Sequence, residues 1–260
     1  MDIFSITLTD IYHILLVMFR TGALLMTVPL FGHVSIPRIL RVWIVLILGF
    51  IIYPSTVLSA VQPPPTIVHF TLAIGGEIAI GLLIGFAVII VFSGVQFAGQ
   101  LVGLQMGLAV ANISDPLGSG QISIVSEFYY LLSLLILITI NGHHFIIEAL
   151  IKCFDLVPVG GAVFKPSLAE YYINLSSMVF VVAVKLAAPV IITLFIINAV
   201  LGIIARTVPQ MNVFIVGFPL AIGVGLAMIG LTLPVFYTII EKVFYGLRIN
   251  ITEIIMMLRG

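Results

Sequence analysis

The chain has 260 residues, of which 62% are hydrophobic and 8% are charged, and its formal net charge is zero. Soluble globular chains carry about 25% charged residues, so this composition, with a mean hydropathy of +1.35, predicts an integral membrane protein. The balanced charge gives no basic patch for a nucleic acid. The length allows one membrane domain, residues 1–260, and no separate soluble domain.

Six hydrophobic blocks follow one another along the chain. They span residues 11–31, 39–60, 67–110, 121–153, 171–205 and 211–247. We expect all of them to be helical, because backbone polar groups in lipid need partners within their own segment. The blocks also lack the period-two alternation of a membrane β-barrel. The predicted fold class is therefore an all-α integral membrane protein, in which some blocks form long broken hairpins.

The third block, residues 67–110, is too long for a single span. As one helix it would extend for about 66 Å, at roughly 1.5 Å per residue. A bilayer core is only about 30 Å thick, and about 20 residues cross it. The block contains one formal charge, Glu77. We therefore expect a helix hairpin that is buried among other proteins and leads into a mobile loop.

Glycines recur at intervals of four residues in this block. Gly81 and Gly85 form one pair, and Gly99 and Gly103 form a second that Gly107 continues. Small residues at this spacing allow another helix backbone to approach closely. The sequence leaves open whether that helix belongs to this chain or to another subunit.

A glycine-rich loop follows the third block. Its residues are Asn112, Ile113, Ser114, Asp115, Pro116, Leu117, Gly118, Ser119 and Gly120. Gly118 and Gly120 permit backbone conformations that are closed to other residues, and Pro116 stops a helix. Ile113 and Leu117 would present apolar tips. This chemistry suits a seal that can move aside, and it equally suits an ordinary connector between helices.

Among the charged residues inside apolar blocks, Glu127 and Glu148 lie close to loop ends, whereas Arg20, Glu77 and Lys185 do not. A charge at the middle of a bilayer costs at least about 2.5–3.5 kcal/mol, so such groups pair with each other or face water. Arg20 with Glu77, or Glu77 with Lys185, are the pairs that we consider. A structural ion pair is favoured over a proton relay, because no chain of carboxylates and histidines is recognisable.

The sequence contains no motif typical of catalysis or of metal binding. GxSxG, P-loop and HExxH patterns are absent, and the chain has a single cysteine, Cys153. His143 and His144 are neighbours that would point about 100° apart on a helix. We expect no catalytic residue, metal or cofactor. A secondary transporter with Glu77 and Lys185 as coupling charges is an alternative, although the proline-interrupted segments do not form two matched halves.

Short motifs rich in glycine and proline mark the boundaries of the blocks. They comprise Pro29, Phe31, Pro37 and Arg38; Gly103-Leu-Gln-Met-Gly-Leu108 with Asp115 and Pro116; Asn141-Gly142-His143; Val208-Pro-Gln-Met-Asn-Val-Phe214; and Gly217-Phe-Pro-Leu220. Together and in this order they resemble the FliR family, the T-type proteins of the type III export apparatus.

This resemblance implies a subunit of a multi-subunit helical export gate. In the flagellar system FliR joins FliP and FliQ in a channel for unfolded flagellar proteins. FlhB associates with it, in the basal body and the bacterial inner membrane. The family's central loop plugs the closed channel. Carried onto this chain, that plug loop is residues 107–122, which begins at Gly107, and Met106 joins the gating residues near the level of a methionine-rich constriction that FliP contributes. Alternatives are a virulence-type secretion relative and a structural subunit without a gating role.

Overall fold

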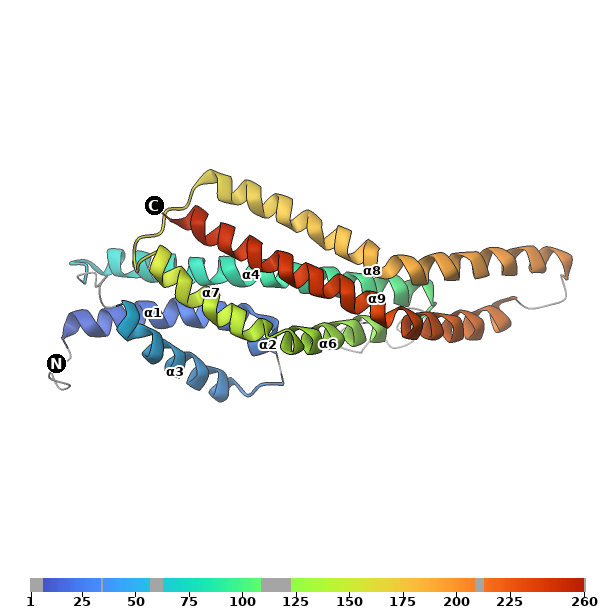
Figure 1. The fold of residues 1–260 in the computed structure, drawn as a ribbon, viewed down its shortest axis with the longest axis horizontal. Coiled ribbons are helices and arrows are strands. Elements are labelled where there is room, and N and C mark those ends of the chain that lie inside the picture. The colour runs from blue at the N-terminus through green and yellow to red at the C-terminus, as the bar shows by residue number, and fades with distance from the viewer. Residues whose placement is uncertain (1–6, 34, 57–62, 109–122, 209–212, 260) are drawn as a thin grey trace. The chain divides into compact units, whose positions relative to one another are not determined.

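The computed structural model describes residues 7–33, 35–56, 63–108, 123–208 and 213–259 (Figure 1). Within these ranges every named element is a helix, and the β-structure consists of an isolated bridge between Ala162 and Arg259. The helices are α1 Leu8–Thr27, α2 Pro29–Gly32, α3 Arg38–Thr56, α4 Ile67–Gln105, α6 Ile124–Thr139, α7 Gly142–Leu156, α8 Pro166–Thr207 and α9 Val213–Leu258. The predicted all-α class is confirmed.

Four helices are long and apolar enough to cross a membrane. They are α1, α4, α8 and most of α9, and the bent pair α6 and α7 makes a fifth candidate span. The chain is therefore a multi-pass membrane protein, as its composition predicts.

The expected hairpin in residues 67–110 is wrong, because α4 is one unbroken helix of 39 residues. The segment contains no proline, and its glycines serve as packing sites rather than breaks. At about 1.5 Å per residue the helix is about 58 Å long, roughly twice the thickness of a bilayer core. The rule that predicted a hairpin treats lipid as the only surroundings of an apolar helix.

The break between helices lies instead in the fourth block, at Asn141. The axes of α6 and α7 differ by 69° there. Asn141 has φ 57° and ψ 29°, in the left-handed region, and its carbonyl accepts the backbone N–H groups of His144 and Phe145. Asparagine enters this region more readily than most residues, and the buried Gly142 follows it. The Asn141-Gly142 pair therefore produces the bend.

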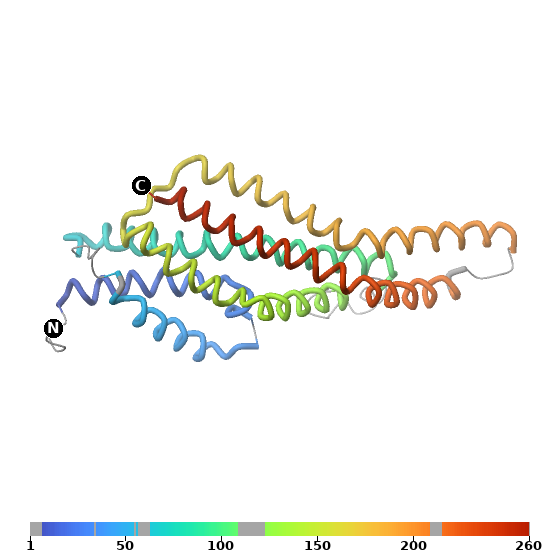
Figure 2. Tube along the Cα trace, viewed as in Figure 1, coloured from blue at the N-terminus to red at the C-terminus, as the bar shows by residue number. Residues whose placement is uncertain are grey.

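The described residues form two compact units, and α4, α8 and α9 each contribute to both. The first unit lies within Met1–Ile90, Asn141–Leu175 and Tyr245–Gly260. Here α1 and the start of α4 run side by side (Figure 2), with Gly81 against Ala23 and Leu24, and Gly85 against Thr27. The core of this unit includes Leu16, Leu24, Ile80, Ile84, Leu150 and Ile254.

The second unit lies within Val91–Ile140 and Ser176–Phe244. It contains the last turns of α4, all of α6, and long parts of α8 and α9. Aromatic side chains fill its interior, with the rings of Tyr129 and Phe236 centred 4.9 Å apart and those of Phe92 and Phe244 5.7 Å apart. Buried aliphatic residues of this unit include Val95, Val102, Leu137, Val190, Leu194 and Ile240.

The left-handed backbone at Asn141 makes a first prediction. Replacing Asn141 by valine should destabilise the protein by about 1–2 kcal/mol, because a β-branched residue is strained in this conformation. The matched control is Asn141→Gly, which keeps the conformation accessible and should be close to the unmodified protein. Thermal unfolding of the detergent-solubilised chain measures both. Equal stability of the two variants would show that the bend does not depend on this backbone angle.

Candidate functional site

Arg20 and Glu77 form a buried ion pair in the first unit. Arg20 Nε donates to Glu77 Oε2 over 2.6 Å, and the two side chains are 0% and 1% exposed. Of the two pairings considered for Glu77, this is the one that the structure contains. A pair so far from water needs hydrogen bonds on its remaining atoms as well as the mutual attraction.

The remaining atoms of the pair are bonded to the end of α7 and the turn that follows it. Arg20 Nη1 donates to the carbonyl of Val157 over 2.7 Å, and the guanidinium carbon lies 4.4 Å from the centre of the Phe154 ring. Glu77 Oε1 accepts the backbone N–H of Gly160 over 2.8 Å. The last carbonyls of a helix have no partner within it. Arg20 thus reaches from α1 to cap α7, and Glu77 fixes the next turn.

Lys185, the other charge predicted inside an apolar block, is exposed on α8 in the second unit. The part of the chain that the structure describes gives it no carboxylate partner. Glu77 is fully engaged by Arg20 and Gly160.

The predicted glycine contacts are occupied by helices of the same chain. Gly81 and Gly85 face α1 in the first unit. In the second unit, an added Cβ at Gly99 would lie 2.7 Å from the backbone nitrogen of Ser126 at the start of α6, and one at Gly103 would meet Ser123 Oγ. Such distances are far below ordinary van der Waals contact, so α4 and α6 touch backbone to backbone. Packing within one subunit accounts for the spacing.

The end of α4 has the geometry of a glycine-terminated helix. Gly107 has φ 79°, its N–H donates to the carbonyl of Leu104, and the N–H of Leu108 donates to the carbonyl of Gly103. This pair of bonds is the Schellman motif, in which a left-handed residue closes the last turn. Gly107 therefore ends α4, and Leu108 is the last described residue before the rest of the plug loop.

A cavity of about 510 Å³ adjoins this helix end. Its lining consists of Leu104, Gln105, Met106 and Gly107 from the end of α4; Asn198, Leu201 and Gly202 from α8; and Gly217, Phe218 and Ala221 from α9. The side-chain amides of Gln105 and Asn198 make the lining of this cavity partly polar and partly apolar. The Met106 side chain is completely buried.

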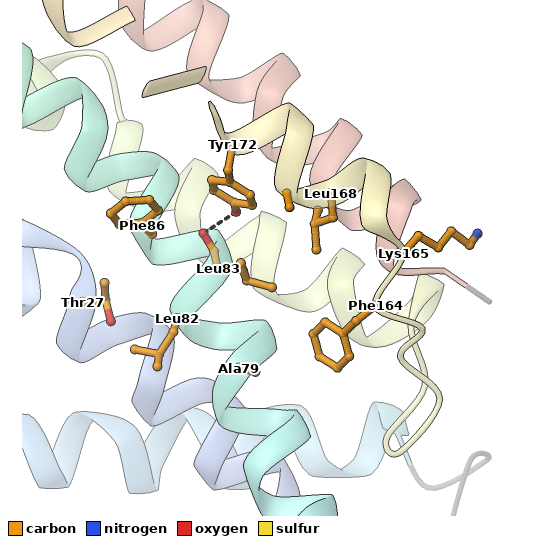
Figure 3. A pocket seen from close by; sticks show the side chains of 10 residues that line it. Thr27, Ala79, Leu82, Leu83, Phe86, Phe164, Lys165, Leu168 and Tyr172 are labelled. Carbon is orange, nitrogen blue, oxygen red and sulfur yellow. Dashed lines mark hydrogen bonds between the residues drawn. The ribbon is translucent and has the colours of Figure 1, made fainter. Parts of the chain in front are cut away.

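A larger and more apolar groove of about 650 Å³ lies in the first unit, between α4 and the start of α8 (Figure 3). One helical face of α4 lines it with Ala79, Leu82, Leu83 and Phe86. Across from them, the Tyr172 hydroxyl donates to the carbonyl of Leu83 over 2.6 Å. The groove suits an apolar occupant, such as side chains of a neighbouring helix or an acyl chain.

Comparison with known proteins decides the family. The profile described as "Bacterial export proteins, family 1" matches residues 11–247. The chain is 34% identical over 236 residues to the flagellar biosynthetic protein FliR of Bacillus subtilis (strain 168), covering 88% of this chain and 89% of that protein. The FliR proteins of Aquifex aeolicus (strain VF5) and Escherichia coli (strain K12) are 34% and 30% identical, with 85% or more of each chain covered.

The chain belongs to the FliR family. It is thus a multi-pass membrane component of the flagellar protein export apparatus. The resemblance to the FliR family, which rested on a few short motifs, is confirmed by similarity over most of the chain.

Most of the predicted gating residues of this FliR-family chain lie outside the described residues. They are Asn112, Ile113, Ser114, Asp115, Pro116, Leu117, Gly118, Ser119 and Gly120. Met106 and Gly107 are described, at the end of α4. Sequence reasoning missed the backbone partners of the buried pair, which are the Val157 carbonyl that accepts from Arg20 and the Gly160 N–H that donates to Glu77. The Pro158-Val-Gly-Gly run was their signal, because glycines after an apolar helix favour a turn whose backbone is accessible to a partner.

The buried pair generates a second prediction. Glu77→Gln should lower the free energy of unfolding by about 3–5 kcal/mol, because the Arg20 guanidinium would be left buried without a counter-charge. Arg20→Met combined with Glu77→Leu should recover only part of this loss, since the carbonyls at the end of α7 would still lack their donor. Thermal unfolding of the solubilised chain measures these changes.

Glu148→Gln is the matched control. Glu148 pairs with Lys152 over 2.7 Å, but both side chains are exposed, at 47% and 57%. Exposed ion pairs contribute little to stability, so this variant should unfold close to the unmodified protein. If Glu77→Gln and Glu148→Gln behave alike, the buried pair is not a determinant of the fold.

Proposed function

We propose that the chain is a subunit of the flagellar type III protein export gate, in the bacterial inner membrane at the flagellar basal body. It forms with FliP and FliQ the channel through which unfolded flagellar proteins pass, and FlhB associates with the same assembly. The plug loop, residues 107–122, seals the channel when no substrate is present. Family membership and the names of the relatives support the export role.

One observation carries the gating part of this proposal: the described chain before and after the plug loop meets at one close contact between α4 and α6, the neck, formed by Gly99 and Gly103 with Ser126 and Ser123. Leu108 is bonded through its N–H to Gly103, and Gly103 packs against Ser123, where the described chain resumes. One turn earlier, Gly99 contacts Ser126, and the Ser126 hydroxyl donates to the carbonyl of Gln96 over 2.8 Å. The loop therefore begins and ends at neighbouring points of a close backbone contact between α4 and α6.

A neck of this kind suits a seal that must open and close without disturbing the helices. The apolar residues Ile113 and Leu117 resist the passage of ions, because an ion in an apolar constriction loses its water of hydration. An unfolded chain displaces the loop by occupying the same space. The packing of α4 on α6 stays in place, so the loop returns when the substrate has left.

Exposed apolar surface on α8 and α9 supports assembly with other subunits. Large side chains at the surface of these helices include Ile192, Phe195, Ile196, Ile203, Leu226 and Leu231. Extensive apolar surface marks a protein interface or contact with lipid. Neighbouring helices of an export gate would cover it.

The plug function is tested by deleting Asn112–Gly120 in cells that contain the complete export apparatus. The complex should assemble, because Leu108 and Ser123, the nearest described residues on either side of the deletion, are both held at Gly103. Ion leakage across membrane vesicles that contain the assembled complex should rise above that of the unmodified complex, since the apolar seal is gone. Assembly is followed by copurification of FliP and FliQ.

A variant in which the same nine positions carry a glycine-serine linker keeps the connection but removes Ile113 and Leu117. It should leak as the deletion does. Assembled complexes that neither leak nor change their export rate would contradict the plug and favour a subunit with a purely structural role.

A further inference from the structure

Met106, which directly follows the last residue of α4, fills space that a glycine of α9 leaves open. The side chain is 0% exposed. An added Cβ at Gly225 would lie 2.7 Å from Met106 Cγ, 2.8 Å from Sδ and 2.9 Å from Cε. Because the contact begins at Cγ, rotation of the flexible sulfur end alone would not relieve it. The Met106 side chain therefore packs directly on the backbone of α9 at Gly225.

A second contact runs in the opposite direction, from α9 to α4. The ring of Phe218 lies against Gly107, where an added Cβ would be 2.7 Å from both Cδ1 and Cε1. Gly107 also has φ 79°, so a side chain there would be strained even without the ring. Each helix thus contributes one large side chain and one glycine.

The two α9 residues of this arrangement lie on one face of their helix. Phe218 and Gly225 are seven residues apart, which is two turns or about 10.5 Å. Two contacts at this separation oppose both sliding and rotation of the α4 end along α9. Other glycines of α9, Gly223 and Gly230, have nothing within 4 Å of an added Cβ, so the close approach is specific to Gly225.

We infer that Met106 and Phe218 are positioning residues, which lock the base of the plug loop to α9. The lock consists of the Met106–Gly225 and Phe218–Gly107 contacts. Its consequence for sealing rests on the proposed gate function. A displacement of α9 is transmitted to the residues from which the loop leaves, and the contacts of Gly99 and Gly103 with Ser126 and Ser123 hold the same end of α4 on α6.

Gly225→Ala in the full chain, within the assembled export complex, tests the lock. The added methyl group overpacks the contact with Met106, so the last turn of α4 should open more often. Hydrogen exchange of the Met106, Gly107 and Leu108 amides reports this directly, because their N–H groups bond to Val102, Leu104 and Gly103. We expect exchange at these amides to be faster by about tenfold.

Gly223→Ala is the matched control, since it adds the same methyl group two residues away, where the described part of this chain has no atom within 4 Å. Exchange should be unchanged in that variant. Met106→Ala in the Gly225→Ala background removes the overlap and should slow exchange compared with Gly225→Ala alone. Equal exchange in Gly225→Ala and Gly223→Ala would overturn the lock. If Gly225→Ala does not assemble, the Met106→Ala variant alone tests the lock. It removes the side chain that contacts Gly225 without adding a clash, so amide exchange should again be faster than in the unmodified protein.

The exchange measurement does not depend on the plug function, so the two proposals can fail separately. If the loop deletion leaks and Gly225→Ala accelerates exchange, then Gly225→Ala should also leak while Gly223→Ala does not. Faster exchange without leakage would overturn the coupling between the lock and the seal. If the deletion itself does not leak, the gate function fails, and the exchange rates alone still support or overturn the lock.

Discussion

The buried ion pair of Arg20 and Glu77 is the constraint on which the first unit depends. Two charges with almost no exposure are stable only when every donor and acceptor around them is matched. Here the matching groups are backbone atoms at the end of α7, chiefly the Val157 carbonyl and the Gly160 amide. Gly160 has φ 74°, a conformation that glycine adopts without strain. The pair thus joins α1 and α4 and also sets where α7 stops.

Close backbone contact is the second means by which this chain holds long apolar helices together. Apolar side chains gain nothing by leaving lipid for one another, so helix association in membranes relies on tight packing and on interhelical hydrogen bonds. Along α4, Gly81 and Gly85 provide such contact with α1, and Gly99 and Gly103 provide it with α6. One helix therefore supplies the packing surface in both units, by the same repeated spacing.

The sequence predicted what depends on composition and local chemistry, and it missed what depends on distance in space. Low charge and unbroken apolar blocks were sufficient for an all-α membrane fold. The hairpin in residues 67–110 failed because the length rule assumes lipid around a helix, whereas glycines of α4 face helices of the same chain. The partner of Glu77 stayed open between Arg20 and Lys185, since separation along the chain does not say which side chains meet.

The contacts at the base of the plug loop were beyond sequence reasoning for a related reason. Gly107 was predicted from a spacing and, through the family resemblance, as the first residue of the plug loop, and Phe218 was noted only as part of a motif. That they meet depends on the left-handed backbone of Gly107, which turns the chain at the end of α4. Nothing in the sequence distinguished Gly225 as a contact site, because Gly223 is also a glycine of the same helix. The two differ only in space, since Gly225 faces Met106 and Gly223 does not.

The neck of the plug loop also bears on how much a conformational change of the loop costs. Bringing the ends of a loop together costs entropy that rises slowly with its length. In this chain the contact of Gly103 with Ser123 already holds the ends close, so that cost is met by the packing of α4 on α6. Whatever arrangement the loop adopts, the packing of α4 on α6 has therefore already met this closure cost. For the proposed seal, opening and closing then need not disturb the contact between α4 and α6.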